Sequence, residues 1–283
     1  MRSESPIVEA KSQLHRLGAK AKKGLGQHFL VDRSVLEKII SAAELEPTDI
    51  VIEVGPGLGI LTEELVKKAA RVIAIEVDSK LASSLQNRLS KFAILTVINA
   101  DILQLDPEDL IDKQKNYKVV ANLPYYVAAP IMRHFLEASL KPSLMVVMVQ
   151  KEVGQSIVAT PGNMSILGIS VQLYGKPTIV DYVPAQSFYP EPKVDSAIVR
   201  IEVYPRPAVG VADIAGFFEI VKTGFSAPRK QIRNSLALGL QLPLAEIVAL
   251  LEQAGIAPQR RPETLSLEEW GSLHCAFSSG YKR

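Results

Sequence analysis

The feature that most constrains the fold is a strand that runs directly into a glycine-rich turn and then a helix. The β-branched, apolar segment 49–54 is predicted to be a buried strand. Residues 55–59 read Gly-Pro-Gly-Leu-Gly, and a helix is predicted over 60–68. This order of elements is the first unit of a doubly wound α/β domain.

The spacing of these glycines favours one kind of ligand. They follow a Gly-x-Gly-x-Gly pattern without the last glycine of the dinucleotide fingerprint, and Glu53 stands two residues before the first of them. This variant favours S-adenosylmethionine, because glycines let the backbone lie against its amino-acid end and no phosphate has to be held. Gly55 and Gly57 are therefore predicted cofactor contacts.

Polar side chains follow the next three predicted strands. Glu76 ends the strand 71–76, about 20 residues beyond Gly55, where a carboxylate binds ribose hydroxyls in such folds. Asp101 follows the third strand and can accept the adenine amine of the cofactor. Asn122 follows the fourth strand. Ligands bind at the carboxyl ends of strands in open α/β sheets, so we expect these residues to share one cleft.

Residues 122–126, Asn-Leu-Pro-Tyr-Tyr, are predicted to hold a flat base that carries an amino group. The Asn122 amide oxygen is one acceptor, and the Leu123 carbonyl is another because Pro124 keeps the residue before it extended. A ring stacked on Tyr125 would present its amine to both oxygens. The alternative is an ordinary proline turn with both tyrosines in the core.

Helices and a proline-rich loop complete the chain. The loop 184–196 contains three prolines and Phe188, which either covers the base pocket or belongs to the core. After the stiff linker 204–207 the pattern is helical. We expect a partly ordered basic arm over 1–21, with 1–10 a solvated tail, a Rossmann-like domain over 22–204 and a small all-α domain over 205–283.

Charge and composition narrow the class of protein. The net charge is only +2, but between Glu9 and Asp32 every charged residue is basic. Lysines and arginines in two segments are candidate RNA contacts, although a solvated basic face is the alternative; they are Lys22, Lys23, Arg229, Lys230 and Arg233. One cysteine and four histidines without ligand spacing predict no metal site. No apolar run reaches membrane-spanning length, so we expect a cytoplasmic enzyme that is a monomer.

From Lys22 to its C-terminus, the chain resembles the small-subunit ribosomal RNA adenine dimethyltransferases (the KsgA/RsmA family). The motifs that carry the resemblance are residues 24–30, 53–59, 122–126 and 188–196. The family implies a class I S-adenosylmethionine-dependent methyltransferase sheet with a C-terminal all-α domain. It also implies N6,N6-dimethylation of two adjacent adenines in the 3′-terminal hairpin of 16S rRNA within the 30S subunit.

The resemblance also assigns residues. Those expected at the cofactor are His28, Leu30, Gly55, Glu76, Asp101 and Asn122. The target base would be held by Asn122, Leu123 and Tyr125, with Phe188 on its other face. The family usually has Asn at the position of His28, and Arg-Arg-Lys where Pro228-Arg229-Lys230 stands here.

Two other functions agree with the same motifs. The resistance-type 23S rRNA adenine methylases share the fold and the motif at 122–125, although the loop around Phe188 and the length of the helical tail favour the small-subunit enzyme. A ribosome-assembly factor that needs no turnover is the second alternative. The intact cofactor positions argue against it.

Overall fold

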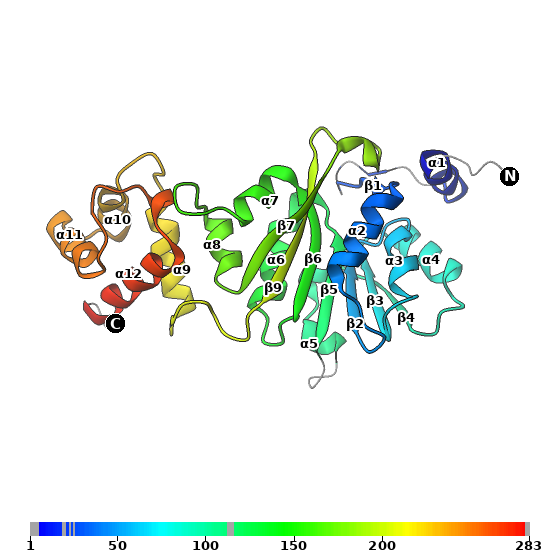
Figure 1. Cartoon of the computed structure of the whole chain (residues 1–283), viewed down its shortest axis with the longest axis horizontal. Coiled ribbons are helices and arrows are strands. Elements are labelled where there is room, and N and C mark those ends of the chain that lie inside the picture. The colour runs from blue at the N-terminus through cyan, green and yellow to red at the C-terminus, as the bar shows by residue number, and fades with distance from the viewer. Residues whose placement is uncertain (1–5, 19–20, 23, 25, 112–115, 281–283) are drawn as a thin grey trace. The chain divides into compact units, whose positions relative to one another are not determined.

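A computed structural model describes residues 6–18, 21–22, 24, 26–111 and 116–280 of the chain. Within them, seven strands form one sheet in the order β4-β3-β2-β5-β6-β9-β7 (Figure 1). The strands are β2 (Ile50–Val54), β3 (Arg71–Glu76), β4 (Leu95–Asn99), β5 (Tyr117–Asn122), β6 (Leu144–Gln150), β7 (Gly175–Val183) and β9 (Ser196–Val203). Strands β2 to β6 pair in parallel and β9 pairs antiparallel to β6. The predicted α/β fold is confirmed.

Helices cover both faces of the sheet because the strand side chains alternate between two apolar faces. One face packs against α2 (Arg33–Ala43) and α3 (Ile60–Leu65) in a core cluster that includes Val51, Val120 and Val146. The opposite face carries Tyr117, whose ring contacts Phe135 of α6 (Ala128–Glu137) at 6.4 Å between centroids. The central strands β2, β3 and β6 are therefore buried on both sides, whereas the edge strands β4 and β7 are partly exposed.

Helix α4 (Ser79–Arg88) was not predicted, although its sequence carries both signals of a helix. Asp78 caps its N-terminus by accepting hydrogen bonds from the backbone of Lys80 and Leu81. Leu81, Ala82 and Leu85 are its buried residues, at the spacing of one helical face. Two short helices, α5 (Pro107–Leu110) and α7 (Lys151–Ile157), lie on either side of β5 and β6 in the sequence.

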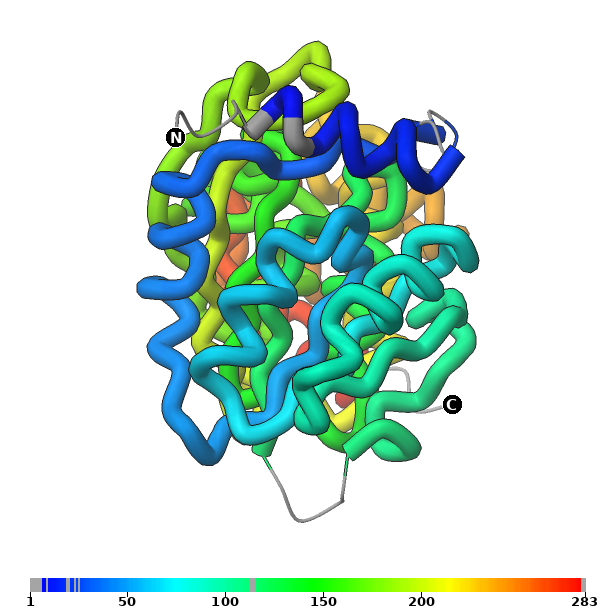
Figure 2. Tube along the Cα trace, turned by 90° about the vertical axis from the view of Figure 1, so that its right-hand side faces the viewer, coloured from blue at the N-terminus to red at the C-terminus, as the bar shows by residue number. Residues whose placement is uncertain are grey.

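The solvated tail was expected over residues 1–10; residues 1–5 lie outside the described residues, and from residue 6 on the segment is not such a tail. Residues 6–16 form helix α1 (Pro6–Arg16), which buries Ala10 and Leu14 in a cluster with Phe29 and Leu58. Figure 2 shows this helix, in dark blue, across the same end of the sheet as the lime-coloured segment that contains β8. Ala10 and Leu14 lie one helical turn apart, but such a pair is buried only where another part of the chain provides a surface to pack against. The sequence of the segment alone does not reveal that surface.

Two very short strands join segments that are distant in sequence. β1 (Phe29–Leu30) and β8 (Phe188–Tyr189) pair antiparallel, with Phe29 opposite Tyr189 and Leu30 opposite Phe188. The backbone of Val31 extends the contact by donating to the Ser187 carbonyl at 2.9 Å. This two-stranded sheet fixes the proline-rich loop to the segment that precedes α2.

The described residues fall into two compact units. One lies within Met1–Gly154 and Lys176–Val203, and the other within Gln155–Gly175 and Tyr204–Arg283. The second unit thus takes in residues 155–175, including α8 (Ile166–Gln172), which the sequence pattern assigned to the larger domain. The expected domain limits stay a prediction.

The second unit is helical after residue 204. Its helices there are α9 (Ile214–Gly224), α10 (Ile232–Leu240), α11 (Leu244–Gln253) and α12 (Leu267–Gly280). The predicted capping box of α12 is confirmed, because Ser266 and Glu269 each accept a hydrogen bond from the other's backbone N–H. Trp270 is fully buried and its ring stacks on Phe225 at 5.7 Å. None of the described helices is long and apolar enough to span a bilayer.

Candidate active site at the carboxyl ends of the strands

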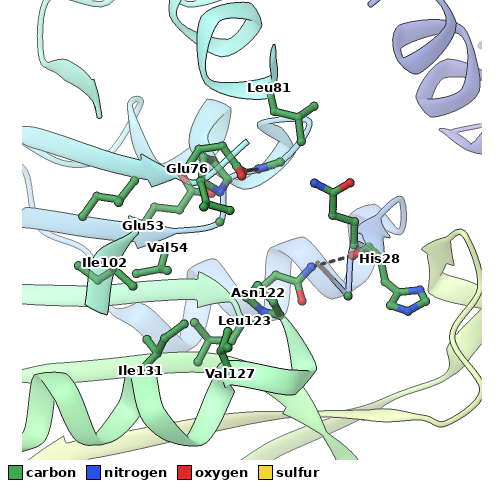
Figure 3. Close-up of a pocket in the computed structure, with 18 of the residues that line it drawn as sticks. His28, Glu53, Val54, Glu76, Leu81, Ile102, Asn122, Leu123, Val127 and Ile131 are labelled. Atoms are coloured by element: carbon green, nitrogen blue, oxygen red, sulfur yellow. Dashed lines mark hydrogen bonds between the residues drawn. The ribbon is translucent and has the colours of Figure 1, made fainter. Parts of the chain in front are cut away.

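One pocket lies at the carboxyl ends of β2, β3 and β5 and beside the segment that follows β4 (Figure 3). Its wall includes Gly55, Glu76, Asp101 and Asn122, which come from four neighbouring strands of the sheet. The structure thus brings together the residues that the sequence placed at successive strand ends. Open α/β sheets bind ligands at this edge.

The glycine turn after β2 forms one wall of the pocket. The φ values of its glycines are positive: +67° at Gly55, +56° at Gly57 and +77° at Gly59. Residues other than glycine rarely adopt such values. A Cβ atom on Gly57 would also stand 2.9 Å from the ring of Phe29. At Gly55 and Gly57 the turn therefore presents backbone to the pocket and leaves room for a ligand to approach it.

The Glu76 carboxylate is held by two backbone N–H groups. Oε2 accepts from Gly57 at 3.0 Å and Oε1 accepts from Asp78 at 2.9 Å. The side chain is 4% exposed, and burial raises the pKa of Glu76 although these two N–H groups oppose the shift. A carboxylate fixed in this way at a strand end can accept hydrogen bonds from two vicinal hydroxyls of a ribose.

Lys22 pairs with Asp78 next to Glu76. The lysine Nζ lies 2.7 Å from Asp78 Oδ2. Burial alone would raise the pKa of Asp78, but the hydrogen bonds from Lys22 and from the backbone of Leu81 and Lys80 lower it below its usual value. Lys22 was predicted to contact RNA; its side chain is 56% exposed beside this ion pair, and the RNA contact stays a prediction. Lys23 lies outside the described residues.

Glu53 is a buried acid on the pocket wall. Its side chain is 1% exposed, and Oε2 has no hydrogen-bond partner among the described residues. Burial raises the pKa of Glu53 to about 8; the Thr62 hydroxyl opposes the shift and the Glu76 charge adds to it. Burial therefore favours the protonated carboxyl group, which carries a proton that it can donate.

Asn122 is oriented by a hydrogen bond to the segment before β1. Its Nδ2 donates to the His28 carbonyl at 3.2 Å, as the dashed line in Figure 3 marks. The amide oxygen is thus the group that can accept from a ligand. Leu123 is buried and its N–H donates to the Met148 carbonyl at 3.1 Å, and φ at Pro124 is −60°. The backbone of this motif is therefore held by the hydrogen bond to β6 and by the proline ring.

The Tyr125 side chain is held through both its hydroxyl group and its ring. Its hydroxyl is 2.6 Å from Ser196 Oγ, and its ring stacks on the His28 imidazole with centroids 5.5 Å apart. Burial raises the pKa of Tyr125, so its hydroxyl is neutral at pH 7. His28 Nδ1 donates to the Pro190 carbonyl at 2.7 Å, which ties the ring pair to the proline-rich loop.

The cofactor candidates His28, Leu30 and Asp101 also line the pocket. Leu30 is buried in β1, and Asp101 accepts from the Leu103 backbone at 3.0 Å. Phe188 does not line the pocket. Its side chain is 2% exposed and packs in the core cluster, which leaves no ring face for a base. The structure therefore favours the core alternative for this residue.

Arg229, Lys230 and Arg233 lie in the helical unit, just before and within α10. Arg229 and Lys230 are exposed, whereas Arg233 is partly buried. The Arg233 Nε atom is buried and has no hydrogen-bond partner in the described part of the chain. Of the three cations predicted in this unit, Arg229 and Lys230 are thus exposed to solvent.

Sequence reasoning did not assign several residues of the pocket wall. Val77 is 52% exposed and Ile102 is buried, and both flank the predicted ribose and adenine contacts. Val77 directly follows Glu76 and Ile102 directly follows Asp101. Their place next to a predicted cofactor contact was the sequence signal that could have assigned them to the pocket. Tyr126 also lines the pocket. No group of three or more His, Cys, Asp and Glu side chains among the described residues is arranged to hold a metal ion.

Comparison with known proteins identifies the family. Residues 18–275 match the family model described as ribosomal RNA adenine dimethylase. The chain belongs to this family. The resemblance drawn from the four motifs is thereby confirmed, and the protein is a member of a family of rRNA methyltransferases.

Curated relatives within the dimethylase family match nearly the whole chain. The ribosomal RNA small subunit methyltransferase A of Dehalococcoides mccartyi is 50% identical over 271 residues, covering 95% of this chain and 92% of the relative. The protein of the same name from Alkaliphilus metalliredigens is 43% identical over 257 residues, with 89% and 90% covered.

Solved structures share the dimethylase fold. A dimethyladenosine transferase from Plasmodium falciparum superposes with a TM-score of 0.76 at 26% identity, covering 89% of this chain and 98% of that one. The 23S rRNA methyltransferase ErmE superposes with a TM-score of 0.70 at 30% identity, with 88% and 98% covered.

Proposed function

We propose that this dimethylase transfers methyl groups to N6 of two adjacent adenines in the 3′-terminal hairpin of 16S rRNA, within the 30S subunit. The observation that carries the proposal is the orientation of Asn122, whose amide nitrogen is engaged by the His28 carbonyl so that its oxygen is the acceptor at the pocket. The names and the 43–50% identity of the bacterial relatives support the small subunit as the source of the RNA.

The described residues fit S-adenosylmethionine as the methyl donor. Glu76 would bind the ribose hydroxyls, and Asp101 would accept the adenine amine. The glycine turn provides a surface that a Cβ on Gly57 would obstruct, and Glu53 offers a buried polar atom without a partner. The donor, when bound, supplies a methyl group on a positively charged sulfur.

The chain's own groups prepare the base for transfer. The N6 lone pair of adenine is delocalised into the ring, so the amine is a poor nucleophile. Oδ1 of Asn122 and the carbonyl of Leu123 would accept its two N–H bonds and favour a tetrahedral nitrogen with the lone pair facing the methyl group. Tyr125 would hold the ring. Positioning and fixed dipoles supply most of the rate.

This chemistry needs no base before methyl transfer. The N6 proton becomes acidic once the nitrogen is alkylated, so it leaves after the bond to carbon has formed. An amide at residue 122 therefore suffices where a carboxylate would be needed to remove a proton first. Dimethylation repeats the step on the monomethylated amine, which still has one N–H for the same two acceptors.

Methylation of isolated small subunits tests the proposal. Undermethylated 30S particles, incubated with the protein and labelled donor, should yield dimethyladenine at two adjacent positions of 16S rRNA by mass spectrometry. A parallel incubation with 23S rRNA tests the resistance-type alternative, which label there and none in the 30S particles would support. Binding to the 30S particles without label would support a non-catalytic assembly factor. A cytoplasmic monomer that takes part in small-subunit biogenesis remains part of the proposal.

Replacing Glu76 tests the cofactor assignment separately. Glu76→Ala removes the acceptor that the Gly57 and Asp78 backbone groups hold in place, so methyl transfer should fall below detection while 30S binding stays measurable. Binding of the donor, followed by calorimetry, should be lost in parallel. Full activity of the variant would contradict the assignment of Glu76 to the ribose.

A further inference from the structure

Tyr126 is a large aromatic side chain left exposed at the pocket. It follows Tyr125 in the 3₁₀ turn Tyr125–Val127 and lines the same pocket as Asn122. Tyr125 is anchored through its hydroxyl and its ring, whereas the Tyr126 side chain is 56% exposed. The two neighbouring rings therefore face different surroundings, one inside the site and one at its mouth.

The Tyr126 ring lies beside the backbone of Gly26. Cδ1 and Cε1 of the ring lie 3.1 Å and 3.6 Å from the position that a Cβ on Gly26 would occupy, and Gly26 has φ +56°. The turn beneath it is closed by the Val127 N–H donating to the Pro124 carbonyl at 3.1 Å. The backbone that carries the exposed ring is thus fixed by the turn, and the ring lies beside Gly26.

A flipped-out base changes the surroundings of its neighbour in the RNA. When one adenine enters the pocket, the next nucleotide loses its stacking partner and is still tethered by one phosphodiester to the mouth of the site. Consecutive residues place their Cα atoms about 3.8 Å apart, so the ring after Tyr125 lies within reach of that nucleotide. Exposed aromatic rings stabilise single-stranded bases by stacking on them.

We propose that Tyr126 is the stacking platform for the nucleotide next to the adenine being methylated. A purine offers the larger ring surface, so a second adenine at that position fits this platform better than a pyrimidine. Tyr126 is then a specificity-determining residue for adjacent adenines and a positioning residue for the flipped strand. The inference rests on the proposed function and deepens it.

Steady-state kinetics on undermethylated 30S particles test the platform. Tyr126→Ala should raise KM for the particles about tenfold, the loss expected for one base–aromatic stack, with a smaller change in kcat. Tyr126→Phe keeps the ring and should behave as the wild type. Tyr182→Ala is the matched control, because Tyr182 is 45% exposed on β7 but does not line the pocket; it should leave KM unchanged.

A change in the RNA gives the decisive readout. In particles reconstituted from transcripts in which one of the two adenines is replaced by uridine, the wild type should methylate the remaining adenine several-fold less efficiently, and Tyr126→Ala should show almost no further loss. Additive losses would overturn the inference, as would an unchanged KM for Tyr126→Ala. An equal loss of donor affinity in calorimetry would assign Tyr126 to the cofactor instead. Wild-type protein inactive on all particles would refute the proposed function itself.

Discussion

Glu53 shows how a single residue can couple the pocket to the stability of the sheet. It lies one residue before the end of β2, the strand that leads into the glycine turn, and is almost completely buried. An ionised carboxylate there would need partners that the structure does not provide for Oε2 among the described residues. The fold therefore favours the protonated form, and the energetic cost appears when the pH removes that proton.

We expect the free energy of unfolding to decrease with pH because of this residue. Below its usual pKa of 4.5 the carboxyl group is protonated in both states, and from there to about 8 it is protonated only in the folded protein. Unfolding then releases a proton, so stability is lost as pH rises through this window, at up to about 1.4 kcal/mol per pH unit. Glu53→Gln should remove this loss.

Urea denaturation of the ligand-free protein at pH 5, 6.5 and 8 measures this effect. The stability of Glu53→Gln relative to wild type should increase by a few kcal/mol from pH 5 to pH 8. The exposed Glu152 provides the control, since Glu152→Gln also removes a carboxyl group but from the surface. Parallel pH profiles for wild type and Glu53→Gln would contradict a buried protonated acid.

At the scale of elements, the glycine turn after β2 combines two constraints in one position. Gly57 needs a positive φ, and its missing side chain leaves room for the Phe29 ring of β1. Its N–H also fixes the Glu76 carboxylate of β3. The turn thereby joins β1, β2 and β3 at the wall of the pocket where we propose that the cofactor binds.

Gly57→Ala should weaken binding of the methyl donor by at least about tenfold. The new Cβ would stand 2.9 Å from Phe29, and a left-handed alanine costs about 1–2 kcal/mol, so the turn must shift away from Glu76. Gly255→Ala is the matched control, since Gly255 has φ +73° but no atom within 4 Å of a Cβ. Calorimetry with the donor should show normal affinity for that control. Equal affinities for both variants would mean that the turn is not a cofactor contact.

The elements that sequence predicted well are those whose signal is local. β2 and β5 are mostly apolar runs, each with one charged residue, and the residue at the end of each run falls at the carboxyl edge of the sheet whatever else the chain does. Glu76, Asp101 and Asn122 could therefore be placed around one cleft from the order of residues alone. The capping box of α12 is likewise complete within four residues.

The parts that could not be predicted depend on distant partners. The strand β1 has two residues and exists only because β8, far along the chain, pairs with it. An aromatic in a proline-rich loop can face a pocket or the core, and no local pattern showed that Phe188 takes the core side. The neutral state of Glu53 is also set by burial that the full sheet creates, rather than by its neighbours in sequence.

At the scale of the whole molecule, the residues that we propose for RNA differ between the pocket unit and the helical unit. The pocket unit presents acceptors and rings for one base, whereas the helical unit presents cations before α10. Phosphate contacts raise affinity without reading sequence, and base contacts select the target. We therefore expect mutations in the two units to affect binding and chemistry separately.

Replacing Arg229 and Lys230 by alanine should lower affinity for 30S particles and reduce the slope of log affinity against log salt by about 1 to 2. Both side chains are exposed, whereas Arg233 is partly buried, so leaving Arg233 in place avoids a folding defect. Lys68→Ala combined with Lys176→Ala removes two exposed charges elsewhere and should leave the slope unchanged. Binding titrations at several salt concentrations, with donor affinity as a second readout, measure both. An unaltered slope would exclude these cations from the interface.

The pairing of β1 with β8 has a consequence for the order of events in catalysis. Phe29 and Leu30 line the pocket, and the hydrogen bond from His28 to Pro190 ties the same segment to the proline-rich loop around β8. The two residue pairs of β1 and β8 thus join the pocket wall to the proline-rich loop, so that the two segments move together. A methyl donor that stiffens this part of the pocket would therefore also stiffen the loop. We expect the donor-bound enzyme to meet its RNA with the loop already ordered.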